Sequence, residues 1–200
     1  AHILIKRYGI QVGDRVAISM RNYPEWILTF MAITAIGGVA VAMNSLWKPE
    51  EMSYGLTDSG AKLLVADEER IDRFNQIEEK SDIAIISVRA TKEYAYDSLE
   101  ALLEQKTDTD MPDQKPLPES NATILYTSGS TGNPKGVVSC HVNIIHALLG
   151  WELEQHCAVA LLDESPPDPP DSPATLLAVP LFHATGSHAV YLASYRHQRR

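Results

Sequence analysis

Short apolar runs alternate with amphipathic segments along the first half of the chain. Apolar residues, many of them β-branched, dominate four runs at positions 15–20, 39–43, 62–66 and 83–88, and each run predicts a strand. Helical periodicity or helix-start signals mark the segments at positions 2–8, 49–57, 68–80 and 98–105. Strands that alternate with helices predict an α/β fold, in which helices cover both faces of a parallel sheet.

The segment at 26–43 has no charged residue and is long enough to raise the alternative of a membrane-spanning helix. Two adjacent glycines at 37–38 divide it, which favours a helix followed by a buried strand at 39–43. We expect the helix to begin after Asn22, which can act as its N-cap, with Pro24 in the first turn.

After the helix expected at 98–105, a polar segment at 107–120 with three prolines interrupts the alternation of strands and helices, as a linker does. The chain is therefore expected to divide into three stretches: a flavodoxin-like α/β part at 1–107, a linker at 108–120, and a second α/β part at 121–200.

The second part combines predicted elements with an irregular stretch. A helix is expected at 139–155, whereas the acidic, proline-rich stretch at 163–173 excludes regular structure because proline removes donors and breaks helices. A strand is expected at 175–180. It would deliver Phe182 and His183 at its carboxyl end, where ligands bind in open α/β sheets.

The chemistry of the second part is concentrated at residues 123–136, whose sequence is Thr-Ile-Leu-Tyr-Thr-Ser-Gly-Ser-Thr-Gly-Asn-Pro-Lys-Gly. Glycines let the backbone approach a ligand closely, and successive backbone N–H groups form an anion-binding concavity. Hydroxyls add donors, and a lysine adds a compact positive charge. The segment predicts a loop that grips a polyphosphate through Thr127, Ser128, Gly129, Ser130, Thr131, Gly132 and Lys135.

Two better-known phosphate loops do not fit this segment. Walker A requires a Gly-Lys pair, but Pro134 precedes Lys135, and the dinucleotide fingerprint requires a spacing that Gly129 and Gly132 do not have. The plain alternative is a surface turn rich in serine and glycine. A strand, four hydroxyl residues and Pro-Lys-Gly in this order disfavour that alternative.

Residues 126–136 resemble the signature loop of the acyl-adenylate-forming enzymes, which include acyl-CoA synthetases, luciferases and the adenylation domains of peptide synthetases. In that family the loop holds the β- and γ-phosphates of ATP while a carboxylate attacks the α-phosphate. Residues 180–186, Pro-Leu-Phe-His-Ala-Thr-Gly, resemble the segment beside the family's acyl pocket. Residues 33–67 also fit the family's N-terminal portion, so the resemblance covers nearly the whole chain.

The resemblance implies roles for individual residues. Lys135 would neutralise phosphate charge, either directly or by ordering the loop. Ser130 occupies the position at which some family members bind Mg²⁺ through a hydroxyl. Phe182, His183 and Gly186 would border the acyl substrate, with His183 stabilising charge or gating the pocket.

The remaining groups of the family's site are expected beyond Arg200: the segment that contacts adenine and carries the Mg²⁺-binding glutamate, the ribose-binding aspartate, and the lysine of the adenylation step. The chain would then hold no complete catalytic set. We expect an N-terminal piece of a longer enzyme that is inactive alone. Its bared apolar surface would favour self-association.

Composition narrows the class of partners. The net charge of −9 argues against a nucleic-acid-binding surface, which is usually basic. Cys140 and Cys157 form neither a C-x-x-C motif nor a zinc-ligand pattern, which is typical of a reducing, cytoplasmic setting. The first residues lack a basic segment with a cleavage site, so no signal peptide is expected.

We therefore expect part of an acid–CoA ligase. Its parent would use ATP to convert a carboxylic acid into acyl-AMP and pyrophosphate, and would then form acyl-CoA with coenzyme A. The resemblance at residues 180–183 favours a fatty or aryl acid. Two alternatives stay open: a peptide-synthetase adenylation domain that delivers to a carrier protein, and a non-catalytic nucleotide-binding scaffold that keeps only the loop.

Overall fold

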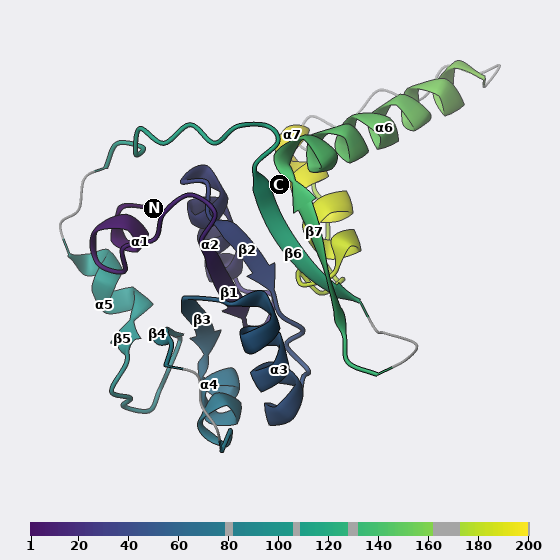
Figure 1. The fold of residues 1–200 in the computed structure, drawn as a ribbon. Coiled ribbons are helices and arrows are strands. Elements are labelled where there is room, and N and C mark those ends of the chain that lie inside the picture. The colour runs from purple at the N-terminus through teal and green to yellow at the C-terminus, as the bar shows by residue number, and fades with distance from the viewer. Residues whose placement is uncertain (79–81, 106–108, 128–131, 162–172, 200) are drawn as a thin grey trace.

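The computed structural model describes residues 1–78, 82–105, 109–127, 132–161 and 173–199. Within these residues, helices flank one sheet of seven strands in the order β5-β4-β3-β1-β2-β6-β7 (Figure 1). All strand pairs are parallel except β6 with β7. The expected α/β class is confirmed. The strands are β1 (Arg15–Ser19), β2 (Val39–Ala42), β3 (Leu63–Asp67), β4 (Ala84–Val88), β5 (Asp97–Ser98), β6 (Asn121–Thr127) and β7 (Lys135–Cys140).

The central strands are buried on both faces, which explains their nearly continuous apolar sequences. Along β1, Val16 and Ile18 pack into the core on one face, while Ala17 packs into the core on the other. The first core receives α1 (His2–Lys6), α2 (Pro24–Ala35) and α5 (Leu99–Glu104), and the second receives α3 (Pro49–Ser59) and α4 (Glu68–Asn75). The four strands expected in the first half are confirmed.

Of two expectations about helices in the first half, the helix followed by a strand at 26–43 is confirmed, and the helix at 68–80 needs correction. The uncharged segment at 26–43 consists of most of α2 followed by β2, and no helix in the described part of the chain is long and apolar enough to cross a bilayer. The helix expected at 68–80 ends at Asn75. Beyond this end the chain leaves the helical path, and Ile77 packs into the core at 8% exposure.

The strand order places the carboxyl end of β6 beside that of β2. The first five strands, β5-β4-β3-β1-β2, stand in the order of flavodoxin-like folds. Residues 109–120 contain neither helix nor strand and lead to β6, which pairs with β2 through Ala40–Thr123 and the next two positions. The sheet therefore continues past the polar segment, and a division of the chain at 108–120 stays a prediction.

The antiparallel pair β6–β7 leads into α6 (His141–Ala160), which extends away from the sheet (Figure 1). This helix was expected at 139–155, but it begins two residues later because Ser139 and Cys140 pair with β6. Every residue of α6 is described, and none is buried. Its apolar residues Ile145 and Leu153 are 49% and 63% exposed.

The strand expected at 175–180 is wrong: residues 173–180 are all described and contain no strand. Both sheet positions beside β6 are already taken by β2 and β7. Asn22 holds this segment instead, since its side chain donates to the Val179 carbonyl oxygen (2.9 Å) and accepts from the Leu181 amide (2.9 Å). Asn22 therefore does not cap α2, whose N-cap is Tyr23 without a side-chain bond.

A close backbone approach at Gly186 folds the chain back after Phe182 and His183. Gly186 lies in a π-helix, η1 (Thr185–Leu192), which continues into α7 (Ala193–Arg196). A Cβ atom on Gly186 would lie 2.1 Å from the carbonyl oxygen of Pro180 and 2.7 Å from its carbonyl carbon. Such contact forces backbone to move, so glycine is required here.

We predict that Gly186→Ala destabilises the fold by about 1–3 kcal/mol, because the added methyl group overpacks this turn. Gly150→Ala in α6 is the matched control, since its Cβ would meet no atom within 4 Å. That change should stabilise the chain by up to about 1 kcal/mol through helix propensity. Urea unfolding of both variants tests the pair, and a neutral or stabilising Gly186→Ala would contradict the close approach.

Asp97 joins α1 to the edge strand β5. Arg7 donates to both of its carboxylate oxygens, at 2.8 and 2.6 Å, and the Tyr8 hydroxyl donates at 2.5 Å. The hydrogen bonds from Arg7, and then from Tyr8, hold the pKa of Asp97 below its ordinary value of 3.8. The ionised carboxylate is thus favoured by folding.

Asp97→Asn should lower the free energy of unfolding at neutral pH by a small amount, because it removes the charged acceptor. The difference from the unmodified chain should be complete above pH 3.8 and shrink as the pH falls toward the depressed pKa, since both chains then present an uncharged group. Urea unfolding at a series of pH values measures it. Asp113→Asn, at a side chain 95% exposed, is the control. A difference that persists unchanged at low pH would rule out this origin.

Candidate functional site

The expected phosphate-binding loop connects β6 to β7. Thr127 pairs with Lys135 at the end of the ladder, and the Thr127 hydroxyl lies 3.5 Å from the Lys135 carbonyl oxygen. Gly132 has a φ of +129°, a conformation that favours glycine. Ser128, Gly129, Ser130 and Thr131 lie outside the described residues. Of the seven predicted phosphate-binding residues, Thr127, Gly132 and Lys135 are thus described, and all three lie at the hairpin end.

Tyr126 fastens the loop end of this hairpin to α3. Its hydroxyl donates to the Asp58 carboxylate at 2.7 Å and also lies 3.2 Å from the Gly55 carbonyl oxygen. Burial, and then the bond to Asp58, raises the pKa of Tyr126, so the group stays a neutral donor at neutral pH. The Trp47 and Tyr126 rings pack in a T-shaped arrangement, with centroids 5.1 Å apart.

Phe182 and His183 enter the site from the segment that Asn22 holds. Phe182 is 6% exposed and belongs to the core, whereas the adjacent His183 is exposed. Their rings lie 4.5 Å apart. The His183 amide donates to the Pro180 carbonyl oxygen (3.1 Å), and the Ser187 amide donates to the His183 carbonyl oxygen (2.9 Å). The backbone at His183 is therefore fixed while its imidazole stays accessible.

One cavity of about 960 Å³ brings these segments together. Four groups of residues line it: the loop after β2 with the start of α3, the carboxyl end of β6, the hairpin, and the segment around His183. Thr127, Gly132, Phe182 and His183 are among the lining residues, and Lys135 and Gly186 are not. The lining is Asn44, Leu46, Trp47, Glu51, Leu125, Tyr126, Thr127, Gly132, Pro134, Val137, Ser139, Val179, Phe182, His183, Ala184 and Thr185.

Charged groups are scarce in this lining. Glu51 is the one carboxylate among the lining residues, and it accepts a hydrogen bond from the Lys48 amide (2.9 Å) in the capping box of α3. Across the described ranges, no three His, Cys, Asp or Glu side chains gather in a way that could hold a metal ion. The predicted Mg²⁺ position, Ser130, lies outside those ranges, so it stays a prediction.

Sequence reasoning missed several residues that shape the cavity. The loop after β2 contributes Asn44, Leu46 and Trp47, which lie within the stretch that resembles the family but were given no role in the site. An asparagine before Pro24 predicts a helix cap at Asn22. Only the fold shows that its amide instead holds residue 179 from 157 positions away.

Comparison with known proteins identifies relatives of this chain. The model of the family described as AMP-binding enzyme matches residues 1–197. A crotonobetaine/carnitine–CoA ligase of Salmonella arizonae is 31% identical over 156 residues, which cover 76% of this chain and 30% of that protein. A long-chain-fatty-acid–CoA ligase of Mycobacterium tuberculosis is 30% identical over 188 residues, which cover 94% of this chain and 34% of that protein. The chain spans about a third of the length of these relatives.

Solved structures share the fold. A fatty acyl-CoA synthetase of M. tuberculosis superposes with a TM-score of 0.73 at 26% identity, covering 96% of this chain and 34% of that chain. An anthranilate–CoA ligase in complex with anthranoyl-AMP gives a TM-score of 0.78 at 24% identity, covering 96% and 35% of the two chains. Together with the family match along nearly the whole sequence, these likenesses show that the chain belongs to the AMP-binding enzyme family of adenylate-forming proteins.

Proposed function

We propose that this chain is the N-terminal part of a longer acid–CoA ligase. Such an enzyme uses ATP to convert a carboxylic acid into acyl-AMP, releases pyrophosphate, and transfers the acyl group to coenzyme A. The observation that supports the proposal is the shared cavity, whose lining includes both the end of the β6–β7 hairpin and Phe182 with His183. A nucleotide phosphate and an acid could meet in this space.

The hairpin end supplies the groups for ATP in this proposal. The hydroxyl of Thr127 and the backbone around Gly132 would face the phosphates, with Ser128, Gly129, Ser130 and Thr131 continuing the cradle. Lys135 would reach the β- and γ-phosphates from the first residue of β7. As the carboxylate oxygen attacks the α-phosphorus, the bond to the bridging oxygen breaks, and the charge gathers on the departing pyrophosphate. A fixed cation near that charge lowers the barrier.

The acid would enter from the opposite side of the cavity. Phe182 offers an apolar surface, and His183 an exposed imidazole beside it. We extend the proposal to a fatty or aryl acid, on the resemblance of residues 180–186. The relatives named above act on carnitine or crotonobetaine and on long-chain fatty acids, so this finer assignment rests on the segment itself. Mg²⁺ would accompany the ATP phosphates and contact Ser130.

We also propose that the protein is cytoplasmic and that this chain alone is inactive. Cys140 and Cys157 are free thiols, which suits a cytoplasmic location. In this proposal the described residues would contact only the phosphate end of ATP, whereas adenylation requires the carboxylate and the α-phosphate to be oriented together. The chain alone would therefore bind nucleotide weakly and turn over no substrate, and the exposed apolar residues of α6 would favour its self-association.

We predict that Lys135→Ala in the full-length protein slows acyl-AMP formation by roughly 10²-fold, because a fixed charge beside the leaving pyrophosphate is lost. Transfer of the acyl group from acyl-AMP to coenzyme A should change much less. Acid-dependent exchange of labelled pyrophosphate into ATP measures the first step, and thioester formation from supplied acyl-AMP measures the second. Lys115→Ala, at a side chain 89% exposed, is the control. Equal slowing of both steps would refute the assignment.

His183→Ala should change the KM or kcat for the acid several-fold while leaving ATP affinity nearly intact, because the imidazole lies on the side of the cavity assigned to the acid. Steady-state kinetics with each substrate varied in turn measure both quantities. His146→Ala, on the exposed surface of α6, provides the matched control. If ATP binding weakened as much as acid binding, His183 would not belong to the acid side.

A further inference from the structure

The loop after β2 lines one part of the cavity, and side chains of α4 hold its backbone. Asn44, Leu46 and Trp47 line the cavity. Within the loop, the Asn44 side chain accepts from the Leu46 amide (2.9 Å), and the Trp47 amide donates to the Asn44 carbonyl oxygen (3.1 Å). These bonds shape the loop but do not attach it to the rest of the fold.

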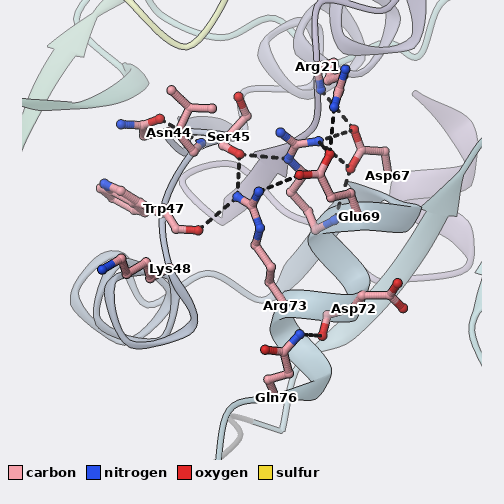
Figure 2. A network of polar contacts seen from close by, with 12 residues as sticks. Arg21, Asn44, Ser45, Trp47, Lys48, Asp67, Glu69, Asp72, Arg73 and Gln76 are labelled. Atoms are coloured by element: carbon pink, nitrogen blue, oxygen red, sulfur yellow. Dashed lines mark hydrogen bonds and ion pairs between the residues drawn. The ribbon is translucent and has the colours of Figure 1, made fainter.

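Two arginines of α4, Arg70 and Arg73, make that attachment, and Figure 2 shows the contacts of Arg73. Nε of Arg70 donates to the Ser45 carbonyl oxygen at 2.8 Å. Nη1 of Arg73 donates to the same oxygen at 2.8 Å and to the Trp47 carbonyl oxygen at 3.1 Å. Two guanidinium groups thus meet at one carbonyl, and Arg73 bridges two. Hydrogen bonds from charged donors are stronger than those from neutral donors.

Carboxylates hold the two guanidinium groups in this arrangement. The Arg70 side chain is 3% exposed, and its Nη1 lies 3.2 Å from Asp67 and 2.8 Å from Glu69. Glu69 also accepts from Arg73 at 2.5 Å and from Arg21 at 3.0 Å. The hydrogen bond from Arg21 and the charges of Arg70 and Arg73 lower the pKa of Glu69, so it stays ionised at neutral pH. A buried charge is tolerated when it is paired in this way.

The network occupies a particular place in the sheet. Arg21 follows β1, and its amide donates to Asp67, the last residue of β3, at 3.1 Å. The connections from β1 and β3 lead to helices on opposite faces, so the switch point of the sheet lies between these two strands. Ligands of open α/β sheets bind at such a crevice. Here charged side chains bridge it, and the cavity lies further along the carboxyl edge, beside β2 and β6.

Contacts continue from the anchored loop to the hairpin. Trp47 is 7% exposed, and its ring fills the space that a side chain at Gly55 would need: a Cβ there would lie 2.5 Å from Cζ3 of Trp47. The same ring packs against the Tyr126 ring in a T-shaped arrangement, and Tyr126 directly precedes Thr127. A shift of the Trp47 backbone would therefore reach the residue from which the phosphate-binding loop departs.

We propose that Arg73, supported by Arg70, is a positioning residue of the cavity. It fixes the Ser45 and Trp47 carbonyl groups, so that the Trp47 ring holds Tyr126 and thereby the start of the 127–135 loop. Its effect on turnover rests on the proposed function, whereas its effect on the position of Trp47 does not.

Fluorine NMR of fluorotryptophan-labelled protein tests the position directly, because the three tryptophans of this chain, Trp26, Trp47 and Trp151, lie in different environments and should give separate signals. In Arg73→Gln the Trp47 signal should shift or broaden, while the signals of Trp26 and Trp151 stay in place. Arg21→Gln is the matched control, since it removes a cation from Glu69 without touching the loop, and it should leave all three signals unchanged. A Trp47 signal that is unchanged in Arg73→Gln would overturn the proposal.

If Arg73→Gln does not fold, Arg73→Lys tests whether Arg73 positions Trp47. Lysine keeps the charge but has a single ammonium nitrogen, whereas Arg73 binds Glu69 through Nη2 and the two carbonyl oxygens through Nη1, so the Trp47 signal should again move. A folded Arg73→Lys with an unchanged Trp47 signal would also overturn the proposal.

Pyrophosphate exchange by the full-length protein tests the consequence for the site. The KM for ATP should rise about tenfold in Arg73→Gln, as expected for lost charged hydrogen bonds, and less than about twofold in Arg21→Gln. A moved Trp47 signal with an unchanged KM would refute the link to the phosphate loop. If the unmodified protein shows no acid-dependent exchange, the proposed function fails, and the NMR result still decides the position of Trp47.

Discussion

Parallel pairing of β6 with β2 is the constraint on which the candidate site depends. Parallel strands end at the same edge of a sheet, so the loops that follow them lie near one another. The register Ala42–Leu125 puts the residue that ends β2 beside the one that precedes Tyr126. The loop that carries Trp47 and the hairpin that carries Thr127 then start from neighbouring positions. Their shared cavity is a direct result of this pairing.

Side chains far apart in sequence complete the walls of that cavity. The segment around His183 has no strand to align it, and the amide of Asn22 takes over this task through two hydrogen bonds. The loop after β2, which also lines the cavity, is held by the guanidinium groups of Arg70 and Arg73, which bind the Ser45 carbonyl oxygen. In both places a polar side chain satisfies backbone groups that no ladder would satisfy, which is the general requirement for irregular chain at a protein interior.

Sequence patterns predicted the elements whose signals are local. The four apolar runs of the first half are strands because their residues must be buried on two faces, and this requirement leaves a visible mark on composition. The loop at 123–136 is rich in residue types that bind phosphate, and the hairpin at its ends is present. The predictions that failed concern residues whose structure is decided by contacts with segments far away in the sequence. The apolar run at 175–180 resembles a strand, yet the neighbouring sheet positions are occupied. Asn22 has the sequence context of a cap but binds a distant segment. No sequence signal indicated that Arg70 and Arg73 would reach the loop after β2.

Arg70 and Arg73 bind only main-chain oxygens of the loop after β2, so the side chains of that loop can vary more freely than its backbone. The carbonyl groups of Ser45 and Trp47 would be present whatever side chains occupied positions 44–46. Substitutions at Leu46 can therefore alter the shape and polarity of the lining without loosening its attachment, whereas the Asn44 side chain also shapes the loop by accepting from the Leu46 amide. The side chain that lines the cavity can thus be exchanged independently of the hydrogen bonds that hold the loop backbone. An engineer could vary this lining to suit another substrate and leave Arg70 and Arg73 unchanged.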